Sequence, residues 1–475
     1  MINKSKKVKA LKGKLNQNNS IVFWETKSKS GVKINQHKLI SFLEKGGFCK
    51  TATKSGISIV RVLENIVSDA PDHEIIDYVK SHLNSKKEEG VLEVFSNGVS
   101  GFINKAKLSL LRTVNIPIDK DPKDASWFYF KNTAVKVTKD ECVLVGYEAL
   151  PQKIWKSRIL DRDFKVPVRT KSDFGEFLYI LAGKNDERFF GLKTIIGYLL
   201  HRYQNRSLTR AVIFVDENMS HDGRANGGTG KTLITEAIGK MRELVGIDGK
   251  NFKIKNGFSN QRIEATTDIV IYDDVQRDFS LVNLYSMITS GVTVEKKYQD
   301  EFYINPENAP KIVISSNYPV KGTGGATDIR RRCEFEVANH YNTIHQPIKD
   351  FGKHFFDDWD ASDWNDFYQL MMNCAMAYLN KGLIIPKPIN LVKNKLVANT
   401  SIEFVDFMKD KIEMDKWIDK RELLKVFNEE YSSIGDITSH LFTKFLKEFA
   451  SQKEYEYRDK SSGGKYSFII KSNKK

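Results

Sequence analysis

The sequence has 475 residues, more than one hydrophobic core normally serves, so we expect several domains. Apolar residues make up 40% of the chain, yet no run approaches the roughly 18 consecutive apolar residues of a membrane span, and no signal-peptide pattern is present. This predicts a cytoplasmic protein without membrane contact. A net charge of +15 favours nucleic acid as partner, and the four widely spaced cysteines exclude a CxxC-type zinc site and a disulfide framework.

The first third of the chain predicts a basic arm followed by a small α/β module. Residues 1–20 are rich in Lys and Asn and lack periodicity, so we expect a disordered arm, with the module at 21–165. Apolar spacing predicts helices near 37–44 and 75–83, and strands at 57–62, 127–130 and 134–137. Asp119, Asp121 and Asp124 lie in a proline-containing loop, which we interpret as a solvated turn rather than the metal-binding acids of a primase.

The rest of the chain divides into four further regions by pattern. Residues 166–207 predict a helical lead-in, with apolar faces at 174–181 and 190–200. Residues 208–345 form the core that carries the motifs, and 346–400 a helical lid and linker, with a helix near 359–379. Residues 401–475 contain the parts of a winged helix, namely helices near 404–411, 420–431 and 437–451 and two β segments around a Ser-Ser-Gly-Gly turn at 461–464.

A glycine-rich segment stands between a strand and a helix at the start of the core. The apolar run 210–215 predicts a buried parallel strand, and apolar residues recur at helical spacing from Leu233 to Val245. Between them stands Asn226-Gly227-Gly228-Thr229-Gly230-Lys231-Thr232. Backbone amides at such a helix N-terminus bind phosphate, so these seven residues predict a phosphate loop. Lys231 would neutralise the β- and γ-phosphates and Thr232 would coordinate Mg²⁺. Ala225 departs from the consensus, which has a glycine there.

Two further apolar runs end in polar residues. Residues 269–272 precede Asp273 and Asp274, and residues 311–316 precede Asn317, with 252–255 as one additional candidate strand. Adjacent carboxylates can divide the work, Asp273 holding the magnesium shell and Asp274 orienting or deprotonating the attacking water. Asn317 can hydrogen-bond the γ-phosphate and that water, although a strand-end asparagine is also a common turn former.

Three consecutive arginines follow at 330–332. In a ring, an arginine of one subunit can reach the γ-phosphate held by its neighbour and offset charge in the transition state. We favour Arg331 for this role, with Arg332 as the second catalytic candidate. The alternative is a surface basic cluster.

The order of these motifs resembles the superfamily-3 helicases of DNA viruses, phages and plasmids, especially the phage and poxvirus-type primase-helicase ATPase module. Residues 288–298 and 301–304 are similar to a family motif that forms a hairpin lining the central channel. The alternation around Val292 and Val294 independently predicts a hairpin, whose turn would present Lys296 and Lys297 to successive phosphates. The segment 197–200 resembles the family's lead-in. The resemblance covers roughly residues 170–475, including the C-terminal winged-helix pattern of many phage members.

This resemblance implies an AAA+-like P-loop NTPase core of α/β class with a parallel sheet, ATP and Mg²⁺ as cofactors, and a homo-hexameric ring. It also implies translocation on single-stranded and forked DNA during replication of a mobile element in the host cytosol. Ring closure suits an arginine that acts in trans, because the head-to-tail interface repeats and closes. The winged helix would contact duplex DNA or dock replication-initiation proteins through His440, Thr443, Lys444, Lys447 and Lys465.

Other function classes remain open. An RNA helicase or RNA-processing ATPase of viral type can share the same three motifs, and a non-motor switch ATPase would use the energy for assembly instead. A rolling-circle nuclease requires two histidines one residue apart, and the sequence has no His-x-His. The module at 21–165 lies outside the resemblance, and we expect it to be an origin-binding or collar module.

Overall fold

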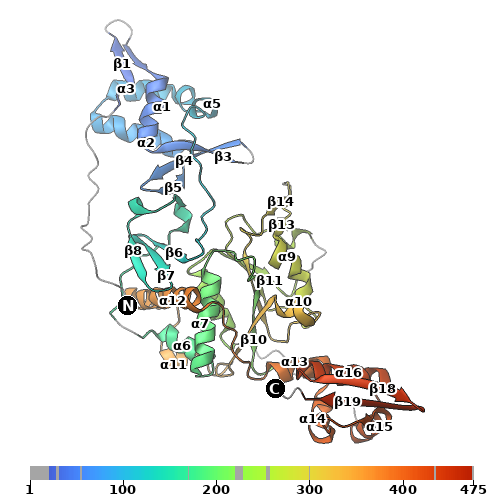
Figure 1. Ribbon diagram of the computed structural model, residues 1–475. Coiled ribbons are helices and arrows are strands. Elements are labelled where there is room, and N and C mark those ends of the chain that lie inside the picture. The colour runs from blue at the N-terminus through green and yellow to red at the C-terminus, as the bar shows by residue number, and fades with distance from the viewer. Residues whose placement is uncertain are drawn as a thin grey trace. The chain divides into compact units, whose positions relative to one another are not determined.

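The computed structural model describes residues 21–27, 31–53, 56–168, 171–219, 228–252, 257–298, 300–432 and 435–472. It is a mixed α/β protein with several sheets, one of them parallel (Figure 1). The chain divides into two compact units. Unit 1 comprises residues 1–165 and 201–203, and unit 2 comprises residues 166–200 and 204–475.

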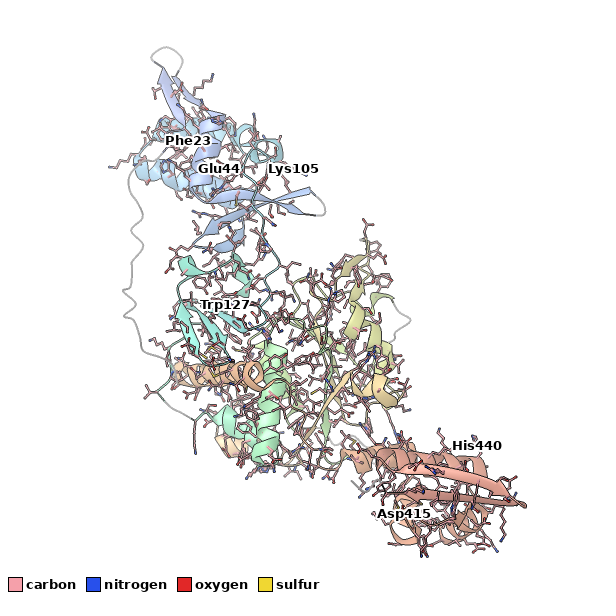
Figure 2. All side chains as sticks on the ribbon, in the orientation of Figure 1. Phe23, Glu44, Lys105, Trp127, Asp415 and His440 are labelled. Carbon is pink, nitrogen blue, oxygen red and sulfur yellow. The ribbon has the colours of Figure 1, made fainter. Side chains whose placement is uncertain are left out.

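Unit 1 begins with a hairpin and helices around an aromatic core. Strands β1 (Trp24–Lys27) and β2 (Gly31–Ile34) pair antiparallel. The helices are α1 (Gln36–Lys45), α2 (Asp72–Lys86), α3 (Glu89–Asn97), α4 (Val99–Phe102) and α5 (Lys105–Leu108). Phe23 is fully buried in this core (Figure 2). Its ring centroid lies 4.9 Å from that of Phe42, with the two rings tilted by 45°. The helices predicted at 37–44 and 75–83 are confirmed as α1 and α2.

Two small sheets complete unit 1. The first has the order β3-β4-β5-β9 and contains β3 (Phe48–Thr53), β4 (Gly56–Leu63), β5 (Ile66–Asp69) and β9 (Ile154–Trp155). The second is an antiparallel meander of β6 (Ala125–Phe130), β7 (Thr133–Thr138) and β8 (Cys142–Val145). Short 3-10 helices η1 (Tyr147–Ala149) and η2 (Lys156–Arg158) flank β9. Trp127 of β6 lies in a second core of the unit (Figure 2). The three strands predicted here are confirmed.

The interpretation of Asp119 and Asp121 as a solvated turn is wrong. Their exposed fractions are 2% and 3%, and both carboxylates pair with the buried guanidinium of Arg202, at 2.5 Å and 3.0 Å. The hydroxyl groups of Tyr129 and Ser126 donate further hydrogen bonds to them. Charged groups are buried in proteins when they are paired in this way. The local loop pattern could not reveal an arginine far along the chain, and Asp124 alone is exposed as expected.

Unit 2 contains a five-stranded parallel sheet with the order β11-β12-β15-β10-β16. Its strands are β10 (Ala211–Asp216), β11 (Leu244–Asp248), β12 (Ile269–Asp273), β15 (Lys311–Ser316) and β16 (Arg332–Val337). Every residue of β10 and β15 is buried, as is typical of parallel strands covered on both faces. Parallel strands end at the same edge of a sheet, so Asp216, Asp273 and Asn317 gather there.

The helix after the glycine-rich segment is shorter than its apolar spacing predicts. Helix α8 (Lys231–Gly239) ends at Gly239, and Val245 belongs instead to the edge strand β11, where it pairs with Val270. A β-branched residue fits such a pleated surface well. The prediction of a strand at 252–255 falls mostly on residues outside the described part, since 253–256 are not described.

Three helices that lie before and after the sheet strands in the sequence pack against one another. They are α6 (Asp173–Leu181) and α7 (Asp186–Leu200), which precede β10, and α12 (Ala361–Lys381), which follows β16. All three confirm predicted helices. A Cβ atom at Gly197 would lie 2.0 Å from the carbonyl oxygen of Cys374, so α7 and α12 approach at backbone distance there. Tyr198 then donates a hydrogen bond to the Arg210 carbonyl at 3.1 Å, which ties α7 to the start of β10.

The remaining elements of this region are short. They are η3 (Gly257–Asn260), η4 (Leu281–Leu284), α9 (Tyr285–Ser290), the antiparallel pair β13 (Val292–Val294) and β14 (Phe302–Ile304), α10 (Gly325–Ile329) and α11 (Pro347–Phe351). The predicted hairpin around Val292 and Val294 is therefore present.

The C-terminal part of unit 2 is a helical module with a small sheet. Its elements are α13 (Leu391–Asn399), α14 (Ile402–Lys411), β17 (Ile418–Asp419), α15 (Lys420–Glu430), α16 (Ser439–Gln452), β18 (Glu456–Ser462) and β19 (Lys465–Lys471). The sheet order is β17-β19-β18, and Phe404, Phe427 and Phe442 share one core. The three predicted helices and the terminal hairpin are confirmed. Among the described residues, no helix combines the length and apolarity needed to cross a membrane.

Candidate active site

The chain enters α8 through two glycines in left-handed backbone conformations. Gly228 has φ +90° and Gly230, which caps α8, has φ +102°. Side chains rarely tolerate these angles, and a Cβ at Gly230 would also lie 3.0 Å from the Phe177 ring. The first turn of α8 therefore starts abruptly at Lys231, where its amides lack intrahelical partners. Asn226 and Gly227, both predicted to bind the nucleotide, lie outside the described residues.

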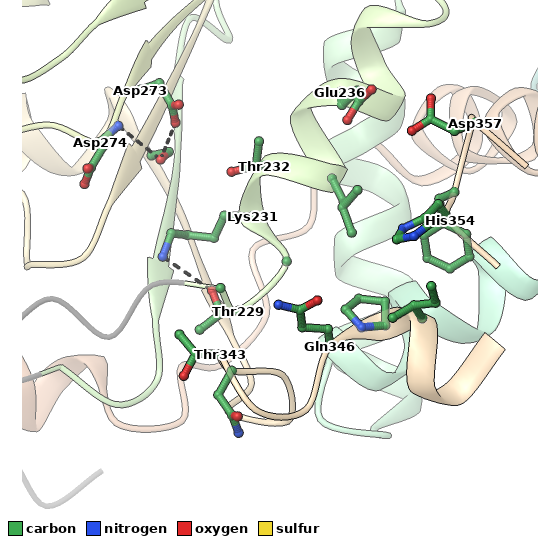
Figure 3. A pocket seen from close by; sticks show the side chains of 18 of the residues that line it. Thr229, Lys231, Thr232, Glu236, Asp273, Asp274, Thr343, Gln346, His354 and Asp357 are labelled. Atoms are coloured by element: carbon green, nitrogen blue, oxygen red, sulfur yellow. Dashed lines mark hydrogen bonds between the residues drawn. The ribbon is translucent and has the colours of Figure 1, made fainter. Parts of the chain in front are cut away.

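A cavity of about 530 Å³ opens beside this helix start (Figure 3). Five predicted site residues from the glycine-rich segment line it, Gly228, Thr229, Gly230, Lys231 and Thr232. Asp273, Asp274 and Asn317 line it as well. The structure thus brings together, in one cavity, the described residues predicted for the phosphate loop, the acid pair and the polar strand end.

Lys231 reaches across the carboxyl ends of the strands. Its Nζ atom lies 2.5 Å from Oδ2 of Asp216 and donates to Oδ1 of Asn317 at 2.9 Å. The hydroxyl of Thr229 donates to the other oxygen of Asp216 at 2.5 Å. Sequence reasoning missed Asp216, although it ends its buried strand as Asp273 ends β12.

The two acids of the pair have different surroundings. Asp273 accepts a hydrogen bond from the Ser315 hydroxyl at 2.7 Å, which fixes its carboxylate from the neighbouring strand β15. Asp274 accepts from Asn317 Nδ2 at 2.8 Å and lies 2.5 Å from Lys250 Nζ. Its φ of +50° is uncommon for a residue with a side chain. The hydrogen bond to Asp274 raises the pKa of Lys250.

The opposite wall of the cavity comes from a segment that no motif predicted. Thr343 and Gln346 follow β16, and His354 and Asp357 precede α12 (Figure 3). Asn342, next to Thr343, lines the cavity as well. These residues carry no strand-end pattern or glycine signature. They are recognised only because the fold returns this segment to face α8.

The two lysines predicted at the hairpin differ in placement. Lys296 pairs with Glu264 and lies over the Phe302 ring, and only 19% of its side chain is exposed. Lys297 is exposed, and the adjacent Tyr298 is fully exposed with φ +61°. An exposed tyrosine at the tip of a hairpin offers a flat ring to solvent, which sequence reasoning did not single out.

The arginines at 330–332 also differ. Arg332 is buried, with Nε 2.7 Å from Asp328 and Nη1 2.9 Å from Glu334, and it donates to the Val320 and Lys321 carbonyls. Arg331 lies over the Tyr285 ring at 4.8 Å and donates to the Thr327 carbonyl. Arg330 is exposed. Arg332 is thus held by groups of its own chain.

The residues predicted to contact duplex DNA lie along α16 and at the start of β19. His440, Lys444, Lys447 and Lys465 are exposed, and Thr443 is half-buried and donates to the Ser439 carbonyl. His440 is labelled on α16 in Figure 2. Lys447 lies over the Tyr457 ring at 5.6 Å. These side chains are separate from the buried face of α16, which packs into the module core.

Comparison with known proteins adds a family match over part of the chain. The model of a family described as "Family of unknown function (DUF5906)" matches residues 223–332, a span that includes Lys231, the acid pair and Asn317. No curated protein matches the sequence. Similar solved structures include the A-form apo structure of the NrS-1 C-terminal region, at 14% identity and TM-score 0.43, with 91% of this chain and 98% of that chain covered. A second apo structure of that region has 14% identity, TM-score 0.42 and the same coverage.

Proposed function

We propose that this protein is an ATP hydrolase whose core has the P-loop NTPase fold of AAA+ type, and that it acts as a superfamily-3-like motor on DNA. One observation carries the proposal. Lys231, Asp273, Asp274 and Asn317 come from a helix start and two strand ends and line one cavity at the carboxyl edge of a parallel sheet. Nucleotides bind at this edge in open α/β sheets.

The cavity suits a nucleotide with magnesium. Its volume of about 530 Å³ lies within the usual range for small-molecule sites. The hydroxyl of Thr232 and the carboxylate of Asp273 are the oxygen donors that Mg²⁺ prefers, and Ser315 holds Asp273 in place. Thr232 and Asp273 would hold the ion, which would supply charge neutralisation at the phosphates.

The chain's own groups divide the hydrolysis between them. Lys231 neutralises charge on the phosphates, and the amides at the start of α8 cradle them. Asp274 either accepts a proton from the attacking water or orients that water. Asn317 forms hydrogen bonds with both Lys231 and Asp274 and therefore holds these two side chains in position. Asp216 holds Lys231 at the sheet edge until phosphate competes for it.

The proposed motor acts as a homo-hexameric ring on single-stranded and forked DNA, in replication of a phage, plasmid or other mobile element. The hairpin of β13 and β14 would grip the strand through Lys297 and Tyr298, since ring stacking and phosphate contact together bind single strands. Arg331 or Arg330 would act in trans, because Arg332 is held within its own subunit. The C-terminal module serves as a winged helix that contacts duplex DNA or initiation proteins.

The test is steady-state ATP hydrolysis by the full chain, alone and with single-stranded DNA, single-stranded RNA or forked duplex. We expect magnesium-dependent hydrolysis that single-stranded DNA stimulates, and unwinding of the fork. Lys231→Ala and Asp274→Asn should each lower kcat by about 100-fold or more. Lys381→Ala removes the same charge from the exposed end of α12 and serves as the control.

The same measurements separate the alternatives. Stimulation by RNA in preference to DNA would favour the viral RNA-helicase class. Hydrolysis that no nucleic acid stimulates would favour a switch ATPase. Equal turnover by the wild type and Lys231→Ala would overturn the assignment of the cavity as an ATPase site.

A further inference from the structure

Two histidines and an aspartate converge beside the cavity, in a segment that the proposed hydrolysis does not use. His340, His345 and Asp350 each offer one ligand atom, and these atoms lie within 4.8 Å of one another. Nε2 of His340 is 3.1 Å from Oδ2 of Asp350, and Nε2 of His345 is 3.0 Å from Oδ1. All three side chains are partly exposed, at 34%, 38% and 27%. An ion and its remaining water ligands can therefore reach them.

The distances fit a compact metal site. Ligand atoms around a tetrahedral ion with bonds of about 2.1 Å lie roughly 3.4 Å apart. The two histidine-to-aspartate contacts, at 3.1 Å and 3.0 Å, are a few tenths of an ångström shorter, and all three ligand atoms lie within 4.8 Å of one another. Two imidazole nitrogens and one carboxylate oxygen, with an open position for water, form a donor set typical of zinc. Magnesium prefers all-oxygen surroundings and does not suit this set.

Neighbouring residues hold the three candidate ligands in place through hydrogen bonds and ring contacts, as is usual for the ligands of a metal site. The hydroxyl of the buried Tyr341 donates to Oδ2 of Asp350 at 3.0 Å, and its ring stacks on His345 at 5.8 Å. Asn342 closes the turn between the histidines, because its side chain accepts from the amides of Ile344 and His345.

We infer that His340, His345 and Asp350 bind a divalent transition-metal ion, zinc above all, at a site separate from the nucleotide cavity. The segment that holds these ligands also supplies Thr343 and Gln346 to the wall of that cavity. Binding would tie His340 and His345 to Asp350 and stiffen the wall. This second effect rests on the proposed function, whereas metal binding does not.

The experiment uses the full chain, stripped of metal with a chelator and titrated with Zn²⁺ by calorimetry. Co²⁺ serves as a spectroscopic probe, because its visible absorption reports nitrogen and oxygen ligation. We expect one ion per chain that excess Mg²⁺ does not displace. His345→Gln and Asp350→Asn should each weaken binding at least 100-fold. Tyr341→Phe keeps the ring but removes the donor to Asp350, and should weaken binding about 10-fold.

Two variants serve as controls. His73→Ala removes an exposed histidine of unit 1 and should leave zinc binding unchanged. Asp273→Asn alters the nucleotide cavity and should also leave it unchanged, so a failed ATPase assignment and a failed zinc site give different results. Circular dichroism melts confirm that each variant is folded. Absence of stoichiometric binding, or equal binding by His345→Gln and Asp350→Asn, would overturn the inference.

Discussion

Lys231 and Asp216 form an ion pair at the floor of the cavity, with Nζ and Oδ2 2.5 Å apart and only 8% and 2% of the side chains exposed. The pair joins the first residue of α8 to the last residue of β10. A triphosphate that binds here must compete with the Asp216 carboxylate for the lysine. If the cavity binds a nucleotide as proposed, the Asp216 carboxylate both positions Lys231 and competes with phosphate for it.

Asp216→Asn should tighten nucleotide binding. The amide keeps hydrogen-bonding capacity toward Thr229 but removes the negative charge, so Kd for ATP should fall by about 10-fold, equal to roughly 1.4 kcal/mol. Thermal stability should fall at the same time, because Lys231 loses its buried partner. Titration with a fluorescent ATP analogue and a melting curve measure the two effects. Weaker binding by a folded variant would contradict this competition.

The hairpin lysines should not be equivalent. Lys297→Ala and Tyr298→Ala should each weaken binding of single-stranded DNA, the tyrosine by about 10-fold, since stacking contributes roughly 1–3 kcal/mol per base. Lys296→Ala serves as the comparison, because that side chain pairs with Glu264 and lies over Phe302. Fluorescence anisotropy with a labelled oligonucleotide at fixed salt gives the affinities. A larger loss for Lys296→Ala than for the other two would refute this assignment.

Acid should lower the stability that the Asp328–Arg332 ion pair gives to the fold. Burial raises the pKa of Asp328, but hydrogen bonds from Arg332 and Tyr285 outweigh it and lower that pKa below its usual value. The ionised carboxylate therefore stabilises the fold above the unfolded pKa of about 3.9, and this contribution is lost as the pH falls through the lower folded value.

Asp328→Asn provides the measurement. At pH 7 the variant should lose about 3 kcal/mol of unfolding free energy, because Arg332 keeps only part of its partners. Below pH 4 the difference from the wild type should shrink. Urea titrations across this pH range report both values. A difference that stays constant down to pH 3 would exclude Asp328 as the source.

The buried charge cluster of unit 1 predicts a stability effect within that unit. Arg202→Met removes the partner of Asp119 and Asp121 and should cost about 3–5 kcal/mol, since two carboxylates remain buried. Asp124→Asn changes an exposed acid of the same loop and should have little effect. Hydrogen exchange in β6 locates the loss. Equal protection of β6 in both variants would show that the cluster does not hold this unit together.

The parallel sheet and its polar edge were largely predictable from sequence. Fully buried strands give unbroken apolar runs, and such runs preceded Asp273 and Asn317, so pattern and position agreed. The glycines before Lys231 were recognisable because the turn into α8 demands left-handed backbone. These features depend on residues that are adjacent in the sequence, so the sequence pattern reveals them.

The features that sequence reasoning missed depend on residues far apart in the chain. Asp119 and Asp121 are buried only because Arg202 folds back onto them, and the wall at Asn342 to Asp357 faces α8 only through the fold. The helix predicted after the glycine-rich segment extends too far, because the apolar spacing continues into β11. Periodicity alone cannot distinguish a helix from a strand over so short a run. Arg332 is the second candidate for action in trans and Lys296 a predicted contact to nucleic-acid phosphates, yet each side chain is engaged by neighbours in its own chain.

The close approach of α7 to α12 at Gly197 limits which fragments of this protein can fold by themselves. A fragment of residues 208–345 keeps every motif of the cavity but lacks both α7 and α12, so surfaces that pack in the intact chain would face water and invite aggregation. Residues 186–381 are the shortest continuous stretch that retains both helices. Gly197→Val, in turn, would force α7 and α12 apart and destabilise the fold without altering any group in the cavity.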